Sequence, residues 1–342
     1  MKAAVFRKPL HIAVEEVPIP ALRPDDVLVR VKSVGICGSD FHYWKTGTIG
    51  DLVIREPLIL GHEVSGEIAD LGDAVSNLAT GDRVVVEPGV PCRKCRFCRE
   101  GRYNLCPRKR FMSDPPTNGA FAEYVAWPSD FVFKLPQNLS FDEGALVEPL
   151  AVGVYAVRRA RIGCGDIVAI LGAGPVGLLT LVAAKNAGAS EIFVTDIDGW
   201  RLEKARELGA TATINARDDP VAGIQELTQG NYVDVTIETS GSMDATVQAV
   251  KATRRGGTIV LVGLYEKREF TYPLLDVVMK ELDVRGSIDY ANSYPASLKL
   301  MASKTFDARS LITHHMKIDD IEKGFRTMAE DSQHRLKVML HP

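Results

Sequence analysis

The hydrophobic and polar positions of the chain follow two patterns, one before and one after about residue 150. In the first part, residues 27–32 place a valine at every second position, and short β-rich runs occur at 84–86 and 124–127. These runs are separated by Gly, Pro and Asp, which is typical of strands joined by turns. The pattern predicts an irregular barrel or a set of small β-sheets from residue 1 to about residue 136.

In the second part, apolar runs alternate with segments that have helical spacing. We predict strands at 167–171, 192–195, 233–237, 258–262 and 282–286, and helices at 150–161, 178–187, 200–208 and 244–252. Strands that alternate with helices favour a parallel sheet covered on both faces. A ligand of such a sheet is expected at the carboxyl ends of its strands.

The pattern becomes irregular again from residue 287, with a predicted helix at 318–329 and a strand at 336–340. We therefore predict a first domain at 1–150, a second at 151–286, and a return to the first domain at 287–342. The run from Ser140 to Glu143 has the spacing of a capping box and should open a helix. Pro149 should interrupt the helical pattern at Glu148, near the domain boundary.

A glycine motif, Gly172-Ala-Gly174-Pro-Val-Gly177, joins a predicted strand to a predicted helix. Gly172 allows a sharp turn, Gly174 has no Cβ to obstruct a pyrophosphate, and Gly177 allows close helix–strand packing. The helix N-terminus would present free N–H groups to the phosphates. The predicted cofactor-binding residues are Gly172, Gly174, Pro175, Val176, Gly177, Asp196, Arg201, Val262 and Gly263.

Asp196 ends the next strand, 19 positions after Gly177, close to the spacing at which an acid reaches the adenosine ribose. A carboxylate there repels a 2′-phosphate, so we predict NAD; the nearby Arg201 leaves NADP as the alternative. Residues 167–184 are uncharged and long enough to raise the question of a membrane span. The Gly and Pro residues within that stretch favour the nucleotide interpretation.

Composition narrows the function classes. The chain has 342 residues, a formal net charge of −3 and a pI of about 6.2, with its charges scattered. The sequence has no basic patch for nucleic acid and no polybasic run for a membrane surface, so we expect neither partner. The N-terminus lacks the apolar core of a signal peptide, and we expect a cytoplasmic protein.

Four of the six cysteines are clustered as Cys92-x2-Cys95-x2-Cys98-x7-Cys106. Four thiolates can enclose one tetrahedral Zn²⁺ and leave no position for a substrate, which predicts a structural zinc site. Paired disulfides or a redox dithiol are the alternative. The same loop carries four cations, which would offset the negative cluster: Arg93, Lys94, Arg96 and Arg99.

Cys37, His62 and Glu63 are candidate ligands of a second zinc. A thiolate, an imidazole and a carboxylate form a three-ligand set whose fourth position stays open, as a catalytic metal requires. With Zn²⁺ this site is formally neutral. Taken singly, each residue has an ordinary interpretation as a buried small residue, a turn histidine or a solvated charge.

The motifs together resemble the zinc-dependent medium-chain dehydrogenase/reductase superfamily. The residues that carry the resemblance are Gly35-Ile-Cys37-Gly-Ser39-Asp40, Gly61-His62-Glu63-x-x-Gly66, the four-cysteine loop and Gly172-Ala-Gly174-Pro-Val-Gly177. Within the superfamily, Cys37-Gly-Ser-Asp-Phe-His42-Tyr43-Trp44, Glu148-Pro-Leu-Ala-Val-Gly153 and Tyr290-Ala-Asn-Ser-Tyr-Pro295 are similar to the sorbitol (polyol) dehydrogenase branch, with xylitol dehydrogenase close.

The resemblance implies a mixed α/β protein, with a GroES-like β-rich catalytic domain and a doubly wound Rossmann domain that meet at the active site. It implies that Cys37, His62 and Glu63 bind the catalytic zinc, that Glu148 lies beside the metal and binds it directly or through water, and that Ser39 and His42 relay a proton. Tyr43, Phe111 and Tyr290 match substrate-pocket positions. The chain departs from the branch at Asp289, where arginine is common, and at Asp114, where threonine is usual; both changes make the pocket more acidic.

The expected function is reversible, NAD-dependent oxidation of a secondary alcohol of a polyol to the ketose, with two zinc ions per subunit and a small-molecule polyol substrate. We expect a homo-oligomer, either a dimer or a tetramer. Three alternatives stay open: a zinc enzyme for galactitol, threonine or an aldonate; a zinc-free reductase of the same fold; and a non-catalytic nucleotide-binding protein.

Overall fold

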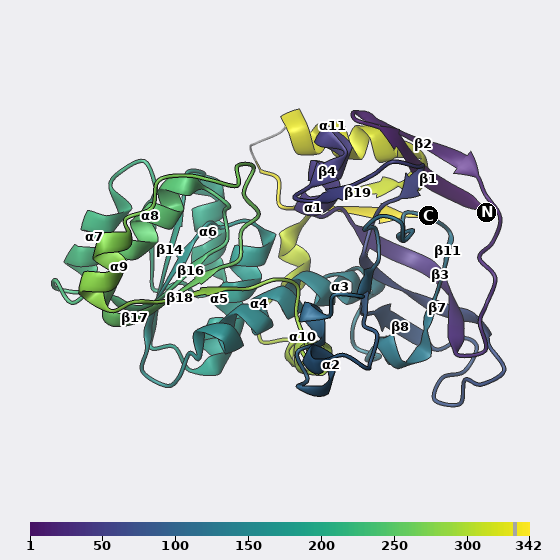
Figure 1. Cartoon of the computed structure of the whole chain (residues 1–342), viewed down its shortest axis with the longest axis horizontal. Helices are drawn as coiled ribbons and strands as arrows, with labels where there is room; N and C mark the ends of the chain where they lie inside the picture. Colours follow the sequence, from purple (N-terminus) through teal and green to yellow (C-terminus); the bar gives the residue numbers. More distant parts are fainter. Residues whose placement is uncertain (331–333) are drawn as a thin grey trace. The chain divides into compact units, whose positions relative to one another are not determined.

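The computed structural model describes residues 1–330 and 334–342, and the chain forms two compact units. Unit 1 contains Met1–Glu148 and Tyr294–Pro342, and unit 2 contains Pro149–Ser293 (Figure 1). The chain thus leaves unit 1 once, builds unit 2 from one continuous segment, and then returns.

Unit 1 is built on a seven-stranded sheet in the order β12-β8-β7-β3-β20-β19, with β11 also paired to β3. Its strands are β3 (Asp26–Gly35), β7 (Glu63–Leu71), β8 (Arg83–Val86), β11 (Tyr124–Pro128), β12 (Val132–Lys134), β19 (Ile312–Lys317) and β20 (Lys337–His341). Val27, Val29 and Val31 are all buried, because alternate residues of a strand face the same side. The strands predicted from this alternation are confirmed.

Smaller elements complete unit 1. The short strands are β1 (Lys2–Lys8), β2 (His11–Glu16), β4 (Thr48–Ile49), β5 (Leu52–Val53), β6 (Leu58–Ile59), β9 (Gly89–Val90) and β10 (Arg110–Phe111). The helices are α1 (Gly38–Thr46), α2 (Arg96–Arg99), α3 (Phe141–Ala145), α10 (Tyr294–Ala302) and α11 (Ile321–Glu330). Single 3₁₀ turns are η1 (Tyr103–Leu105), η2 (Ser129–Phe131), η3 (Ala308–Leu311) and η4 (Ile318–Asp320).

The capping box before α3 is confirmed, whereas the expected break at Glu148 is wrong. The Ser140 hydroxyl accepts a hydrogen bond from the Glu143 amide, and the Glu143 carboxylate accepts one from the Ser140 amide. Helix α4 (Val147–Ala160) runs through Pro149 without interruption. Proline is tolerated there because the first turn of a helix needs no backbone donor.

Unit 2 is a parallel sheet of six strands in the order β15-β14-β13-β16-β17-β18. The strands are β13 (Ile167–Leu171), β14 (Glu191–Asp196), β15 (Ala212–Asn215), β16 (Val233–Glu238), β17 (Thr253–Leu261) and β18 (Asp283–Gly286). The remaining helices are α5 (Pro175–Ala187), α6 (Gly199–Glu207), α7 (Pro220–Leu227), α8 (Met243–Ala252) and α9 (Leu274–Lys280). Counted from β13, this order is 3-2-1-4-5-6, the arrangement of dinucleotide-binding sheets.

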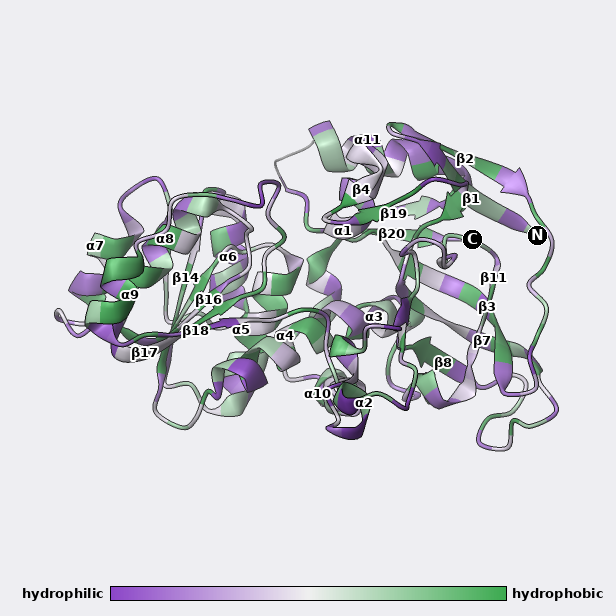
Figure 2. Ribbon diagram, in the orientation of Figure 1, coloured by the Kyte–Doolittle hydropathy of each residue, from purple (hydrophilic) through white to green (hydrophobic). Residues whose placement is uncertain are grey.

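The central strands β13 and β14 are buried at all but their first residue, and β13 is apolar throughout, as expected for a sheet with both faces covered (Figure 2). The uncharged stretch 167–184 divides into β13 and the start of α5 rather than one long helix. Among the described residues, no helix is both long and apolar enough to cross a membrane.

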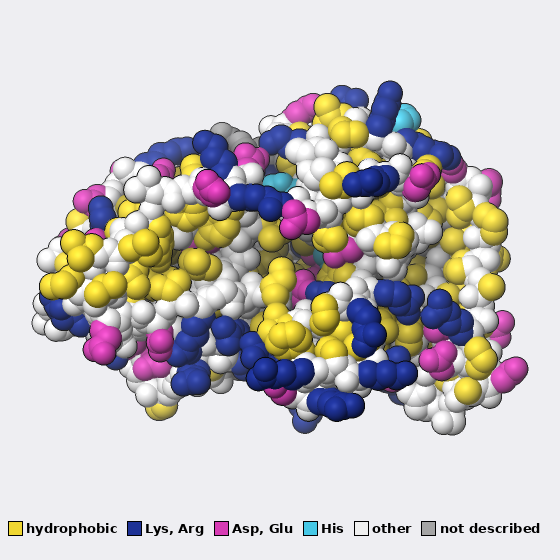
Figure 3. All heavy atoms as spheres, viewed as in Figure 1, with side chains coloured by type: hydrophobic (Ala, Val, Ile, Leu, Met, Phe, Trp, Pro, Cys, Tyr) yellow, Lys and Arg dark blue, Asp and Glu magenta, His cyan; other side chains and the backbone are white. Residues whose placement is uncertain are grey.

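One apolar surface of unit 2 stands out. Four side chains of α9 are more than half exposed, namely Leu274, Leu275, Val278 and Met279, and Val284 of β18 is exposed beside them. Figure 3 shows hydrophobic side chains gathered over this part of unit 2. Of the α9 side chains, Val277 packs against the core instead.

Candidate functional site

The strand ladder of unit 1 brings Cys37, His62 and Glu63 together. Cys37 follows β3 as the N-cap of α1, and Glu63 is the first residue of β7, the antiparallel neighbour of β3. One ligand atom from each of the three side chains lies within 4.8 Å of the other two. His62 is 4% exposed and Glu63 is fully buried. A thiol, an imidazole and a carboxyl group that converge in a buried place fit a zinc ion.

Asp40 orients two of these three residues, and the sequence analysis assigned it no role. It is fully buried, and its carboxylate accepts hydrogen bonds from the amides of Cys37 and Gly61, each at 3.0 Å. The Nδ1 atom of His62 lies 3.0 Å from the Ser113 hydroxyl and 3.5 Å from Asp40 Oδ1. Nε2 is therefore the nitrogen available to an ion, and its ring is held from behind, as ligating histidines usually are.

A buried ion pair holds Glu63. The Lys337 ammonium donates to both carboxylate oxygens of Glu63, at 2.6 and 2.7 Å, and to the Ile36 carbonyl at 3.3 Å. Burial opposes the charge on Lys337, but Glu63 and the Cys37 thiolate outweigh it and raise the pKa of Lys337. A Cβ at Gly35 would lie 2.1 Å from Glu63 Oε2, so this pair requires glycine opposite Glu63 in the β3–β7 ladder.

Burial and neighbouring charge also shift the pKa of His62. Burial opposes its protonation, whereas Asp40 and the Cys37 thiolate favour it, so that the pKa of His62 is raised well above its ordinary value. The negative charges of Asp40 and the Cys37 thiolate thus favour a cation at the His62 imidazole. A zinc ion would replace the proton in that role.

Glu148 and Glu87 add two more buried carboxyl groups. Glu148 lies in the first turn of α4, is 4% exposed, and its charge raises the pKa of Lys337 and of Glu87. Glu87 accepts a hydrogen bond from the Tyr103 hydroxyl at 2.6 Å. Burial is the main cause that raises the pKa of Glu87 to about 7. Sequence reasoning identified Glu148 but not Glu87.

The predicted relay and pocket residues of unit 1 lie on α1 and nearby. Ser39 and His42 are three positions apart on α1 and share one side of the helix. The Tyr43 hydroxyl donates a hydrogen bond to Asp114 Oδ1 at 2.9 Å. The Phe111 ring contacts the His62 ring edge to face, with 5.4 Å between centroids.

Two predicted substrate residues, Asp289 and Tyr290, belong to unit 2. Tyr290 is 3% exposed, and Asp289 has a positive φ of 46°. Their roles stay predictions.

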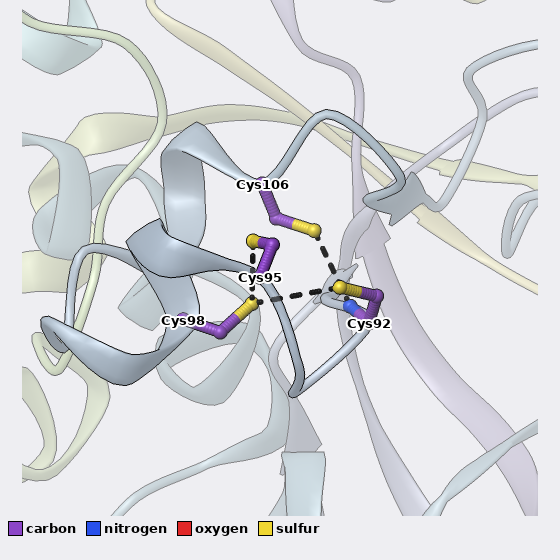
Figure 4. Close-up of side chains that lie close together, drawn as sticks. All are labelled: Cys92, Cys95, Cys98 and Cys106. Carbon is purple, nitrogen blue, oxygen red and sulfur yellow. Dashed lines mark hydrogen bonds between the residues drawn. The ribbon is translucent and has the colours of Figure 1, made fainter.

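The four clustered cysteines of unit 1 lie around a common centre (Figure 4). Their sulfur atoms lie within 4.8 Å of one another, and the pairs Cys95–Cys98 and Cys92–Cys98 are 3.3 and 3.9 Å apart. These separations exceed a disulfide bond and are those of thiolates that share an ion. In the described structure, all of these thiols are free.

The expected charge balance around this cluster is wrong in detail. Arg93 pairs with Asp130 at 2.7 Å, and Arg96 pairs with Glu100 at 2.6 Å, so neither charge is directed to the thiols alone. Instead, the Arg108 guanidinium lies 3.4 Å from the Cys92 sulfur. The backbone amides of Lys94 and Cys95 lower the pKa of Cys92 to about 5, which favours the thiolate that a zinc ion requires.

The glycine motif of unit 2 has the geometry of a phosphate-binding turn. Gly172 has a φ of +106°, and Gly174 is the N-cap of α5, followed by Pro175 and Val176. A Cβ at Gly177 would lie 1.9 Å from the Gly172 carbonyl oxygen, so close packing requires glycine there. At Gly174 a Cβ would meet no atom of the described chain within 4 Å. That open space suits a pyrophosphate at the helix N-terminus.

The carboxyl ends of β14, β16 and β17 complete this edge of the sheet. Asp196 ends β14, and its carboxylate accepts hydrogen bonds from the amides of Ala173 and Asp198, at 2.7 and 2.9 Å. Glu238 ends β16; its side chain is buried, and its carbonyl oxygen accepts from the amides of Val262 and Gly263. The Arg201 guanidinium lies 3.7 Å from Asp198 Oδ2.

Two family models match the chain. Residues 23–137 match the alcohol dehydrogenase GroES-like domain, and residues 175–303 match the zinc-binding dehydrogenase domain. Together with the dinucleotide-type sheet, these matches define a zinc-binding dehydrogenase. The chain belongs to the zinc-dependent medium-chain dehydrogenase/reductase superfamily and, within it, is similar to the sorbitol dehydrogenases.

Individual relatives match along nearly the whole chain. A sorbitol dehydrogenase of Bacillus subtilis (strain 168) is 43% identical, over 100% of this chain and 97% of its own length. An L-idonate 5-dehydrogenase of Vitis vinifera is 42% identical, over 94% of this chain and 90% of its own length. The crystal structure of an Escherichia coli oxidoreductase/dehydrogenase of unknown specificity has a TM-score of 0.95 and 37% identity, over 99% of this chain and 98% of that one.

These comparisons confirm the predicted family and fold class: a GroES-like domain joined to a Rossmann domain. Zinc and a nicotinamide nucleotide are the ligands of this class of dehydrogenase. The roles of individual site residues come from the geometry above and from the resemblance.

Proposed function

We propose that this protein is a zinc- and NAD-dependent polyol dehydrogenase that oxidises a secondary alcohol to the ketose, reversibly. One observation carries the proposal: Cys37, His62 and Glu63 converge in a buried place, with their ligand atoms within 4.8 Å of one another. Full-length similarity to a sorbitol dehydrogenase, at 43% identity, supports the polyol as substrate class.

The proposal includes two zinc ions per subunit. The Cys37, His62 and Glu63 set has three ligands and suits a catalytic ion, while the Cys92, Cys95, Cys98 and Cys106 set is closed and suits a structural one. When bound, the catalytic zinc would supply Lewis acidity to the substrate hydroxyl, and the nicotinamide would accept the hydride.

The protein's own charges set the polarity of the catalytic site. Cys37 and Glu63 balance a divalent ion, and Lys337 then adds one positive charge beside Glu63. Glu148 lies close enough to Lys337 to raise its pKa and offsets that charge. A site close to neutrality can accept an alcohol and release a ketone with similar ease, consistent with a reversible reaction.

Ser39 and His42 are proposed to carry the proton of the alcohol to solvent. Their shared side of α1, directly after Cys37, supports this order. An imidazole titrates near neutral pH and can therefore accept and release a proton under working conditions.

NAD is proposed rather than NADP. Asp196 places a carboxylate at the end of β14, where it would repel a 2′-phosphate. Arg201, the residue that favoured NADP, lies 3.7 Å from Asp198 and is partly neutralised by it.

A neutral polyol is favoured over an acidic substrate by Asp114. Its carboxylate, held by the Tyr43 hydroxyl, can accept hydrogen bonds from polyol hydroxyls but repels the carboxylate of an aldonate. Tyr43 and Phe111 are proposed pocket residues of unit 1, and Asp289 and Tyr290 are proposed substrate residues of unit 2. L-Idonate remains the alternative substrate because a relative of that name is 42% identical.

Self-association is proposed through β18 and α9. β18 is an edge strand, and among the described strands none pairs with its outer side. An edge strand flanked by exposed apolar side chains can pair with the same strand of a second copy about a two-fold axis.

The test is NADH formation over sorbitol, xylitol, galactitol, threonine and aldonates, each with NAD and with NADP. We expect turnover of one or more polyols with NAD, abolished in Cys37→Ser and kept in Cys164→Ser, whose thiol is exposed outside both clusters. A protein that turns over no alcohol, or an unchanged Cys37→Ser enzyme, would favour the non-catalytic alternative. Full activity after exhaustive chelation would favour the zinc-free reductase.

A further inference from the structure

A third group of metal-ligating side chains lies at the other end of β20 from the catalytic candidates. Asp142 of α3, His315 of β19 and His341 of β20 each offer one ligand atom, and these atoms lie within 4.8 Å of one another. We refer to Asp142, His315 and His341 as the C-terminal triad.

The triad is assembled by the sheet rather than by sequence proximity. Strands β19 and β20 are parallel neighbours, with His315 opposite Met339, so that His341 follows two positions along the same face of β20. The two imidazole rings stack at 5.5 Å between centroids, with 11° between their planes. Asp142 is fixed from behind by a hydrogen bond from the Ser33 hydroxyl of β3.

The distances fit a metal ion. Asp142 Oδ1 lies 2.9 Å from His341 Nε2, and Asp142 Oδ2 lies 3.6 Å from His315 Nδ1. Two ligands of a tetrahedral ion with bonds of about 2.1 Å are about 3.4 Å apart. After small side-chain rotations, one carboxylate oxygen of Asp142 and one nitrogen of each imidazole ring could therefore all bind a single ion.

The C-terminal triad is accessible to solvent. The side chains of Asp142, His341 and His315 are 25%, 38% and 54% exposed. Both histidines line a surface hollow of about 1170 Å³, which also contains charges of both signs, including Lys323 and Asp320. Solvent can thus complete the coordination shell, as it does in exchangeable sites.

We propose that the C-terminal triad binds a divalent transition-metal ion, with zinc, nickel and copper as the ions that two imidazoles and one carboxylate prefer. The bound ion would join α3, β19 and β20 within unit 1. This site lies apart from the catalytic candidates, because Lys337, which holds Glu63, is four residues from His341 along β20, or about 13 Å. The proposal does not depend on the proposed enzymatic function.

The first experiment counts zinc. The untagged full-length protein is equilibrated by dialysis against micromolar ZnCl₂, and bound zinc per chain is measured for wild type, His315→Ala, His341→Ala and His11→Ala. His11 is an exposed histidine of β2 outside the triad and is the matched control. We expect wild type and His11→Ala to bind one zinc more than either triad variant, and the affinity for that zinc to fall at least about tenfold when a histidine is removed.

An equal zinc count in wild type and both triad variants would overturn the proposal. Because His315 is the most exposed member, His315→Ala should fold, and its circular dichroism spectrum checks this. A second measurement adds one equivalent of Cu²⁺ to the zinc-loaded protein, because Cu²⁺ binds nitrogen and oxygen ligands more tightly than Zn²⁺ and should displace it from the exposed triad. We expect electron paramagnetic resonance to show coupling to two imidazole nitrogens in wild type and to one in each triad variant; coupling that is the same in all three proteins would also refute the site.

Discussion

Lys337 illustrates how a single buried charge can have different consequences with and without a metal. In the metal-free protein, Glu63 depends on Lys337 for charge compensation, whereas a bound zinc would supply that compensation itself. We expect Lys337→Met to lower the free energy of unfolding by about 3–5 kcal/mol in chelated protein and by clearly less in zinc-loaded protein.

Urea unfolding in both metal states measures this difference. Lys2→Met is the matched control, because Lys2 pairs with Asp319 at the surface, where the two side chains are 47% and 54% exposed. Its loss should cost under about 1 kcal/mol in either state. A Lys337→Met penalty that is the same with and without zinc would contradict the role assigned to Glu63.

The raised pKa of Glu87 implies that the free energy of unfolding depends on pH. Burial, the main cause, raises its pKa to about 7, whereas an unfolded glutamate titrates near about 4.3. Between these values the folded state binds more protons than the unfolded state, so stability falls as the pH rises from about 4.3 to about 7 and is then constant. Glu87→Gln, whose amide oxygen can still accept from Tyr103, should remove this fall, worth up to about 4 kcal/mol.

Thermal unfolding of wild type, Glu87→Gln and Glu56→Gln between pH 5 and 8 is the measurement. Glu56 is exposed, and its variant should follow wild type. Parallel pH profiles for wild type and Glu87→Gln would show that the carboxyl group does not carry the effect.

At the scale of residues, the sequence indicates candidates whose ligands are close in the chain, whereas it does not indicate contacts between distant partners. The cysteine and glycine motifs are contiguous, and spacing alone identified them. Lys337 contacts Glu63 across 274 positions, a pairing that the register of β20, β3 and β7 determines. Asp40 had a local signal, its position three residues after the N-cap Cys37, but capping chemistry is not usually expected of a cysteine.

At the scale of elements, two glycines of the turn between β13 and α5 are needed for different reasons, Gly177 for packing and Gly174 for the proposed nucleotide contact. Gly177→Ala would place a Cβ 1.9 Å from the Gly172 carbonyl oxygen and should lower stability by about 1–3 kcal/mol. Gly174→Ala meets no described atom within 4 Å, so stability should change by under about 0.5 kcal/mol while NAD affinity falls at least about tenfold.

Thermal unfolding and NADH fluorescence titration test both variants. Gly199→Ala, at the start of α6 and also open, is the control for a helix N-terminal glycine outside the motif. If Gly174→Ala binds nucleotide as tightly as wild type, the phosphate position is wrong.

The cysteine loop predicts a second effect at this scale. Residues 92–106 contain only the short helix α2 and the turn η1, among the described elements, so we predict that their order depends on the proposed shared ion. Cys106→Ser should remove one zinc per chain and speed trypsin cleavage of the loop by about tenfold or more. Cys164→Ser should change neither quantity, and an unchanged zinc count in Cys106→Ser would contradict a four-thiolate site.

Two strands that the sequence analysis did not predict share a physical cause. β15 and β19 are half-buried strands with weak alternation, and β15 has only four residues. Their pairing with β14 and β20 supplies the stability that local propensity does not, as is common for strands. The error at Pro149 has a different cause. Proline interrupts the interior of a helix, but it is tolerated in the first turn, where Pro149 lies.

At the scale of the whole molecule, the chain divides its proposed chemistry between two units. The candidate zinc ligands, the relay residues and Asp114 belong to unit 1, while the nucleotide edge and Tyr290 belong to unit 2. The alternation of strands and helices predicts a division of this kind, because each predicted domain has its own period of apolar residues. Substrate choice was not predictable to the same depth, because Asp114 and Asp289 depart from the residues that are usual in the sorbitol dehydrogenase branch.

At the scale of the whole molecule, the proposed self-association can be tested at α9. Four of its seven side chains are 61–73% exposed and apolar, an arrangement that water does not favour on a monomer surface. Leu275→Asp combined with Val278→Asp should place two charges in the proposed interface and dissociate the assembly to the 37.4 kDa chain. Light scattering after size-exclusion chromatography measures the mass.

The control is Leu227→Asp, at an exposed apolar position of α7, which should have the same mass as wild type. A wild-type protein that is itself monomeric at micromolar concentration, or a double variant that keeps the wild-type mass, would mean that β18 and α9 are not the interface.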